Sequence, residues 1–313
     1  MAAGAPHALA RRRACEAARG RLAVVSRAAG ADGETRWPAP AKLNLFLHVT
    51  GRRADGYHEL QTLFQLIDLA DSIAIRVRAD GVIERPEGPP DVAPEADLTV
   101  RAARALQAAT GTSLGAELRV LKRIPLGGGL GGGSSDAATA LVALNALWKC
   151  GMEVAELARL GRSLGADVPV FIEGFSAWGE GVGDRLTPVE LPERWYLVIH
   201  PGVAVSTAAV FQSHELTRNS RLITIRALFE SGGRNDCEGV VRKLCPEVGE
   251  ALDWLGRFAP AHLTGTGSCV FAAFATAAEA ERLAARVPDR WTSAVARGLN
   301  VSPLRARLRQ GQG

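Results

Sequence analysis

The chain has 313 residues, of which 47% are hydrophobic and 22% charged, a composition typical of a globular protein with room for two domains. The formal charge of +4 arises in residues 1–36, which hold seven Arg and three acidic residues, whereas residues 37–313 carry 30 basic and 30 acidic side chains. This balance argues against a nucleic-acid-binding protein, because contact with a phosphate backbone requires a basic surface.

Residues 1–36 are rich in Ala and Arg and show no strand or helix pattern. We expect a disordered N-terminal extension, or a start assigned too early. We favour both over a transit peptide, which is usually rich in serine, because Ser26 is the only serine in residues 1–36. No apolar run reaches membrane-spanning length, and residues 22–25 are too short for the core of a secretory signal. The five cysteines form no CxxC pair and no Cys/His cluster with zinc-ligand spacing. We therefore expect a cytoplasmic protein in a reducing compartment, with no membrane contact and no such metal site.

The folded body is predicted to begin at Trp37, and its first strand covers residues 41–50, where apolar and polar residues alternate. One face of this strand is expected to be buried, while the other carries Lys42 and Asn44 side by side. The apolar face consists of Leu43, Leu45, Leu47 and Val49.

The rest of the chain mixes strands and helices without regular alternation, which predicts an α+β fold with two domains and a cleft between them. Strands are predicted near residues 59–66, 72–78, 117–124, 195–200 and 293–296, with a strand–turn–strand unit at 263–274. Helices are predicted at residues 97–109, 137–148, 152–164, 206–212, 237–243, 247–258 and 277–286.

The most informative segment is Pro125-Leu126-Gly127-Gly128-Gly129-Leu130-Gly131-Gly132-Gly133-Ser134-Ser135, between a predicted strand and a predicted helix. Glycine lets backbone N–H groups approach a phosphate closely, and a helix N-terminus favours negative charge. Ser134 and Ser135 are expected to add hydroxyl donors. A flexible linker is the competing interpretation, which the Ala/Leu-rich helix directly afterwards disfavours. A Walker A loop requires a Lys after its glycines, and no Lys follows them here. A dinucleotide-binding fold requires a second strand in the region where this sequence predicts a helix.

This loop resembles the ATP-binding signature of the GHMP kinases. Residues 40–45 resemble the first motif of that family and residues 263–268 the third, so the resemblance extends from about Ala39 to the C-terminus. Residues 51–60 and 165–171 resemble one branch, whose substrate is a small molecule with a cytidine diphosphate group. The resemblance implies an ATP-binding N-terminal domain at residues 37–188 and a C-terminal substrate domain at residues 189–313.

The resemblance also implies phosphoryl transfer from ATP, with Mg²⁺, to an alcohol, which needs a phosphate cradle, a cation and a base. It gives these last two roles to Lys42 and Asp167. Without the resemblance, Lys42 would be read as a solvated strand lysine and Asp167 as a helix N-cap. Asp136, at the start of the helix after the glycines, is expected either to cap that helix or to help hold Mg²⁺. The sequence assigns no Mg²⁺ ligand.

At the substrate end, the resemblance implies a cytidine clamp of Tyr57, His58 and Phe211, since aromatic faces stack on a base and His can hydrogen-bond its edge. Asn44 is expected at the acceptor-alcohol end, and the turn of Gly265, Thr266 and Gly267 at the substrate diphosphate. Two alternatives stay open. Another GHMP kinase, such as a mevalonate or homoserine kinase, shares the loop without needing a base clamp, and a non-catalytic ligand-binding relative is expected to lack Lys42 or Asp167.

Overall fold

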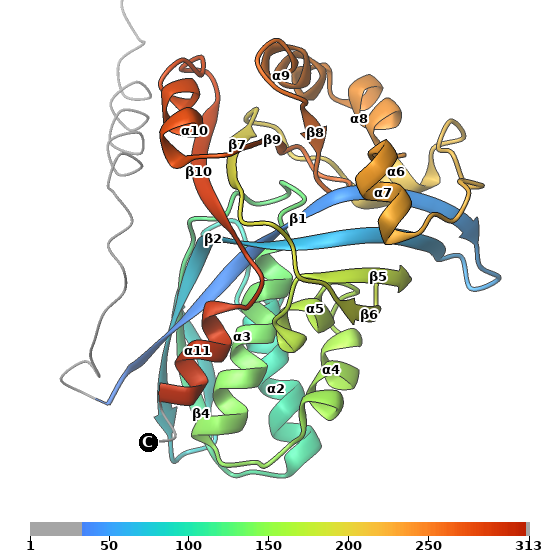
Figure 1. Ribbon diagram of the computed structural model, residues 1–313. Coiled ribbons are helices and arrows are strands. Elements are labelled where there is room, and N and C mark those ends of the chain that lie inside the picture. Colours follow the sequence, from blue (N-terminus) through green and yellow to red (C-terminus); the bar gives the residue numbers. More distant parts are fainter. Residues whose placement is uncertain (1–32, 311–313) are drawn as a thin grey trace, which may run out of the picture.

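The computed structural model describes residues 33–310 (Figure 1), so residues 1–32 of the predicted extension lie outside the described part. The strands form one ten-stranded sheet whose main path runs β3-β4-β2-β10-β7-β9-β8, while β1 and β5 pair with β2, and β6 with β5. β3 and β4 pair in parallel, and the other strand pairs are antiparallel. The strands are β1 (Thr35–Arg52), β2 (His58–Arg78), β3 (Ile83–Glu87), β4 (Gly115–Leu121), β5 (Ala177–Gly181), β6 (Arg185–Pro188), β7 (Trp195–His200), β8 (His262–Leu263), β9 (Val270–Phe274) and β10 (Thr292–Leu299).

Helices gather in two groups, one on each half of the molecule (Figure 1). The first group packs under β1 and β2 around the Ala/Leu-rich helix α3. The second group packs mainly against the strands β7 to β10, except that α7 packs against β1, β2 and β5 through Leu228. The first group contains α2 (Leu98–Thr110), α3 (Gly132–Leu147), α4 (Val154–Arg162), α5 (Val168–Glu173) and α11 (Pro303–Gln310). The second contains α6 (Thr207–Gln212), α7 (Ile225–Ser231), α8 (Glu238–Leu244), α9 (Pro246–Gly256) and α10 (Ala277–Ala284).

Local sequence signals explain the helices that were predicted well. The side chain of Asp97 accepts a hydrogen bond from the backbone N–H of Thr99 at 2.7 Å, and Gly111 ends α2 in a left-handed conformation with φ of 66°. Ser206 caps α6 in the same way, through the backbone N–H of Ala209 at 3.3 Å. Both helices confirm the sequence prediction, as does the α+β mixture as a whole.

The predicted strands at residues 59–66 and 72–78 are wrong as separate elements, because β2 is continuous over His58–Arg78. Two acidic residues interrupt the apolar pattern between them. In the structure each binds a neighbouring segment: Asp71 accepts the backbone N–H of Ile124 at 2.8 Å, and Asp68 that of Arg297 at 2.7 Å. The polar break in the pattern is therefore not a turn, and its two carboxylates bind the backbone of neighbouring segments to β2.

The prediction that β1 buries only one face is also wrong. Lys42, Asn44, Phe46 and His48, on the face expected to meet solvent, are all buried. β1 lies between the two halves of the molecule, where helix α3 covers it from the first half and the turn between β8 and β9 contacts it from the second. Burial of both faces is thus a tertiary effect of the central position of β1.

The predicted boundary between residues 188 and 189 falls in the connection between β6 and β7. The chain then crosses back, because β10 pairs with β2 through Gly298 and Leu299, and Leu304 of α11 is buried in the core of the first half. β1 begins at Thr35, two residues before the predicted start of the folded body.

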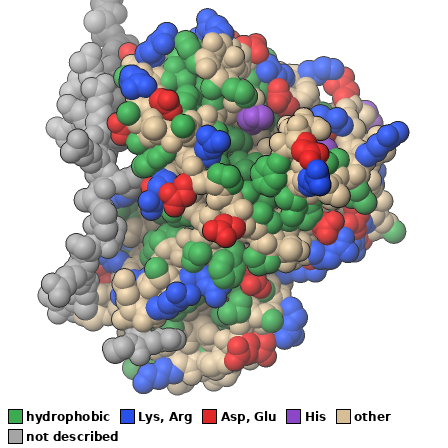
Figure 2. All heavy atoms as spheres, viewed as in Figure 1, with side chains coloured by type: hydrophobic (Ala, Val, Ile, Leu, Met, Phe, Trp, Pro, Cys, Tyr) green, Lys and Arg blue, Asp and Glu red, His purple; other side chains and the backbone are tan. Residues whose placement is uncertain are grey.

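Basic and acidic side chains are interspersed on the face shown in Figure 2, in line with their equal numbers in residues 37–313. None of the helices in residues 33–310 is both long enough and apolar enough to span a membrane.

Candidate active site

A cavity of about 760 Å³ lies between the two halves of the molecule. Its walls combine the glycine loop, the central strand β1, the tip of the β1–β2 hairpin and two segments of the second half. All the residues named from the sequence as candidates for the site line this cavity except Ser135, Asp136 and Gly267. The lining residues among them are Lys42, Asn44, Tyr57, His58, Pro125, Leu126, Gly127, Gly128, Gly129, Leu130, Gly131, Gly132, Gly133, Ser134, Asp167, Phe211, Gly265 and Thr266.

The glycine loop leads directly into α3, which begins at Gly132, five residues earlier than predicted. Gly131 precedes the helix in a left-handed conformation with φ of 74°. Gly129 also has a positive φ of 78°, and a Cβ there would lie 2.2 Å from the carbonyl oxygen of Thr264. Only glycine fits this approach, which brings the loop backbone against the turn of the second half. The first N–H groups of α3 consequently begin at the cavity wall, in the arrangement that favours an anion.

Ser135 and Gly267 support the loop from behind. The hydroxyl of Ser135 is fully buried and donates to the carbonyl oxygen of Pro40 at 2.6 Å, so the expectation that it offers a hydrogen bond into the site is wrong. Gly267 packs so closely on the loop that a Cβ would lie 2.0 Å from the backbone nitrogen of Gly129. Both residues therefore help to fix the shape of the loop.

Lys42 and Asp167 come together although 125 positions separate them in the chain. Nζ of Lys42 lies 3.4 Å from Oδ2 of Asp167, and the two side chains are 4% and 33% exposed, respectively. Asp167 stands at the N-cap position of α5, yet within residues 33–310 its side chain makes no capping hydrogen bond. Its carboxylate is therefore free to face the cavity, which the helix-cap interpretation would not allow.

Asn44 links this pair to the second half of the molecule. Its Oδ1 accepts a hydrogen bond from Nζ of Lys42, and its Nδ2 donates to Oγ1 of Thr62 at 2.9 Å. Its backbone N–H donates to Oγ1 of Thr264 at 3.0 Å. Because a buried ammonium group is costly unless it has polar partners, Asn44 and Asp167 together explain how Lys42 is tolerated inside the protein.

Lys122 is a cavity residue that the sequence analysis missed. Its Nζ lies 2.7 Å from Oδ2 of Asp136 and also pairs with Asp71, so two carboxylates share one ammonium group. Burial raises the pKa of Asp136 against the attraction of Lys122, and the neighbouring charge of Asp71 raises it further. The available signal was position, since Lys122 stands three residues before the glycine loop, where a cation can lie close to a bound phosphate.

Asp136 itself does not line the cavity and is buried under Lys122. Within residues 33–310 no group of three or more His, Cys, Asp or Glu side chains is arranged to hold a metal ion. The described residues therefore supply no metal cage, and we assign no step to a protein-bound metal. Mg²⁺ commonly binds kinases through substrate phosphates and retained water, and needs few protein ligands.

The three predicted clamp residues all line the cavity, and two of them are in contact. The rings of His58 and Phe211 are stacked, with centroids 4.9 Å apart and an interplanar angle of 21°. Tyr57 is 62% exposed at the tip of the β1–β2 hairpin. The first half thus contributes Tyr57 and His58 to the wall, and the second half contributes Phe211.

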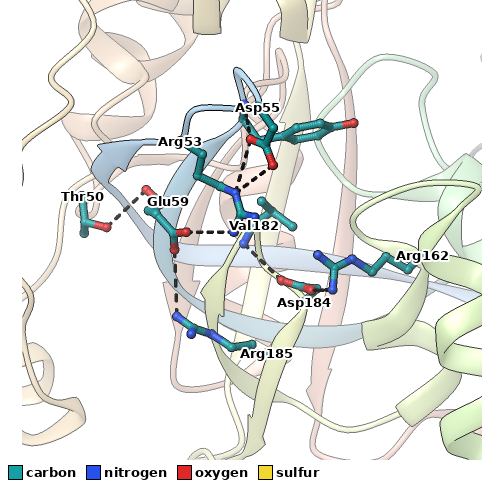
Figure 3. A network of polar contacts seen from close by, with 9 residues as sticks. Thr50, Arg53, Asp55, Glu59, Arg162, Val182, Asp184 and Arg185 are labelled. Carbon is teal, nitrogen blue, oxygen red and sulfur yellow. Dashed lines mark hydrogen bonds and ion pairs between the residues drawn. The ribbon is translucent and has the colours of Figure 1, made fainter.

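Exposed ion pairs hold the hairpin that carries Tyr57 (Figure 3). Arg53 pairs with Asp55 at 3.1 Å and with Glu59 at 3.0 Å, and Asp55 accepts the backbone N–H of Tyr57 at 3.1 Å. Solvent-exposed pairs contribute little to stability. Their effect here is local, because together they close the turn and fix where Tyr57 leaves it.

Comparison with known proteins agrees with this geometry. Residues 97–175 match the family model of the GHMP kinases N terminal domain, and residues 213–293 match that of the GHMP kinases C terminal. The first match covers the glycine loop and Asp167, and the second covers the turn of Gly265 to Gly267. Fold and cavity together define a small-molecule kinase of the GHMP type.

The relatives narrow this class. A 4-diphosphocytidyl-2-C-methyl-D-erythritol kinase of Alkalilimnicola ehrlichii is 58% identical over 276 residues, covering 88% of this chain and 95% of the relative. A crystal structure of 4-(cytidine 5'-diphospho)-2C-methyl-D-erythritol kinase has 34% identity and a TM-score of 0.74, covering 84% of this chain and 99% of that one. The chain belongs to the GHMP kinase family, in the group of the 4-diphosphocytidyl-2-C-methyl-D-erythritol kinases.

More distant structures share the fold alone. Homoserine kinase of Cytophaga hutchinsonii has a TM-score of 0.63 but 18% identity, covering 90% of this chain and 98% of that one. The predicted GHMP-kinase fold is therefore confirmed.

Proposed function

We propose that this protein transfers the γ-phosphate of ATP to the 2-hydroxyl of 4-(cytidine 5'-diphospho)-2-C-methyl-D-erythritol. The observation that carries the proposal is the ion pair of Lys42 and Asp167, 3.4 Å apart, on the wall of a cavity that also contains the glycine loop. The names of the relatives at up to 58% identity supply the choice of substrate.

ATP binds with its phosphates on the glycine loop in this proposal. The backbone N–H groups of the loop and the N-terminus of α3 offer donors without bulk, and Ser134 adds a hydroxyl group at the cavity wall. Lys122 places a further positive charge beside the first turn of α3. Mg²⁺ bound by the phosphates would supply further positive charge there.

Asp167 acts as the general base for the accepting hydroxyl group. An alcohol is a weak nucleophile near neutral pH, and a carboxylate within hydrogen-bond reach assists its deprotonation. Lys42 stabilises the negative charge that develops during transfer, because its ammonium group is fixed beside Asp167 before the reaction begins. Asn44 holds the ammonium group of Lys42 and is in position to contact the acceptor end of the substrate.

Tyr57, His58 and Phe211 bind the cytidine end of the substrate, and Gly265 and Thr266 support its diphosphate. The proposed division into an ATP-binding part at residues 37–188 and a substrate part at residues 189–313 follows from this arrangement. The substrate part is incomplete alone, however, because Tyr57 and His58 come from the first half.

The test is a coupled assay of ADP release over a panel of alcohols, with the position of the new phosphate read by NMR. We expect turnover with the cytidine diphosphate substrate and little with mevalonate or homoserine. Preference for either of those two would replace the proposal with another GHMP kinase activity. ATP binding without ADP release on any alcohol would favour a non-catalytic relative.

A further inference from the structure

Arg218 lies behind the proposed base clamp and joins its two sides. Its Nε donates a hydrogen bond to Nε2 of His58 at 3.1 Å. One terminal nitrogen donates to the carbonyl oxygens of Phe211 at 2.8 Å and Ser213 at 2.7 Å, and the other to that of Leu216 at 3.2 Å. The guanidinium group thus fixes a residue of β2 against the end of α6.

This contact decides where His58 carries its proton. A guanidinium nitrogen can only donate, so Nε2 of His58 must supply a lone pair. A neutral imidazole has one N–H group, which then lies on Nδ1. Among residues 33–310 no group is hydrogen-bonded to this Nδ1. The atom is also absent from the fully buried side-chain atoms that lack a partner, so it is accessible from outside. Because His58 lines the cavity, its Nδ1–H is open to a ligand there.

We propose that Arg218 is a positioning residue for base recognition, which locks His58 in the Nδ1–H tautomer and so fixes a donor toward the pyrimidine ring. The inference rests on the proposed function and gives its cytidine site a basis for selectivity. Cytosine has an acceptor at N3, whereas uracil carries a hydrogen atom there. A fixed donor facing N3 therefore favours cytosine and opposes a uracil base, by attraction to one and repulsion of the other.

The charges around His58 keep it neutral. Burial lowers the pKa of His58 first, and the positive charges of Arg218 and of Arg52, its partner in the β1–β2 ladder, lower it further. Phe211, which stacks on the imidazole ring, carries no charge. Near neutral pH the imidazole therefore has a single N–H group, and Arg218 determines which nitrogen bears it.

Loss of Arg218 predicts an unusual pH dependence. Without the guanidinium group a neutral His58 is free to adopt the Nε2–H tautomer, which turns Nδ1 into an acceptor. Below its pKa the imidazole carries a hydrogen atom on both nitrogens, so the donor on Nδ1 returns. Binding of the cytosine substrate should then be impaired at high pH and recover as the pH falls.

The experiment compares Arg218→Met and Arg218→Lys with the parent enzyme, on the cytosine substrate and on its uracil analogue. KM and kcat are measured between about pH 5.5 and about pH 8.5, on either side of the ordinary histidine pKa of about 6.5. Arg226→Met is the matched control, because Arg226 is 87% exposed and pairs with Glu230 on the outer surface of α7.

We expect Arg218→Met to raise KM for the cytosine substrate about tenfold at the high-pH end, the effect of one lost hydrogen bond, and much less at the low-pH end. The preference for cytosine over uracil should fall, while KM for ATP and the Arg226→Met control stay unchanged. Arg218→Lys, which keeps a donor, should show a smaller rise. An equal rise at every pH, an unchanged base preference or no rise at all would overturn the inference.

A second measurement does not depend on any Arg218 variant. The ring-nitrogen shifts of ¹⁵N-histidine in the parent enzyme, assigned to His58 by comparison with His58→Gln, report the tautomer directly. Protonated Nδ1 supports the inference, and protonated Nε2 overturns it. Failure of the parent enzyme to phosphorylate the cytosine substrate would refute the proposed function, and the tautomer would still be read separately.

Discussion

Replacing Asp167 by asparagine tests the proposed base while preserving the shape of the site. The side chain makes no capping hydrogen bond to α5 within the described residues, so the change removes charge and basicity without removing a helix cap. We expect kcat to fall about 10²–10⁴-fold, the usual contribution of general acid–base catalysis, while KM for ATP changes little.

Lys42→Met is the corresponding change in the other partner. Methionine is similar in length to the buried lysine stem, which lies near the ring of Phe64, so it fills the space without leaving a large void. We expect kcat to fall again. The double variant should lose less than the product of the two single effects, because residues that act as a unit are not additive.

The assay is ADP release under saturating ATP, with thermal melting of each variant as the control for folding. Asp136→Asn is the matched control, because it is a second aspartate beside the glycine loop but lies buried under Lys122. Near-normal turnover by Asp167→Asn would refute the assignment of the base. A collapse in Asp136→Asn with Asp167→Asn unaffected would move the role to Asp136.

Three further predictions concern the substrate clamp, the loop and the N-terminus. Phe211→Ala should raise KM for the cytidine substrate about 5–150-fold and leave KM for ATP nearly unchanged, since stacking is worth about 1–3 kcal/mol per base; equal effects on both would indicate a folding defect. Gly129→Ala should weaken ATP binding in calorimetry, because its Cβ would meet a carbonyl oxygen at 2.2 Å, whereas Gly239→Ala, with open space around it, should not. Deletion of residues 1–32 should leave kcat and KM intact, because the residues lining the cavity begin at Lys42, and a large loss would contradict this.

Much of the site could be predicted from the sequence because its chemistry is concentrated in short segments. A run of glycines between a strand and a helix has few uses, and the resemblance of residues 40–45 and 165–171 to segments of the family then connected Lys42 with Asp167 across the chain. The helices that carry their own start and stop signals, such as α2 with Asp97 and Gly111, were also predictable.

Other features depend on contacts between distant segments, to which local patterns are blind. β2 stays continuous through Asp68 and Asp71 because distant backbone N–H groups bind their carboxylates. α5 is too short for a periodic signal, and it begins at the residue that follows Asp167. Arg218 is one arginine among many in the sequence, and only the fold brings it to His58.

The burial of Lys42 and Asn44 explains why pattern analysis misread β1. Alternation separates two faces of a strand, but it cannot tell a face that meets water from one that meets a polar cavity. Lys42 donates its backbone N–H to the carbonyl oxygen of Leu130 in the glycine loop, and Asn44 donates its own to Thr264 in the second half, at 3.0 Å each. β1 therefore ties together both elements proposed to hold the phosphates. Lys42 and Asn44 face the cavity where the two halves of the molecule meet, which is where the proposed reaction would require an ammonium group and an amide.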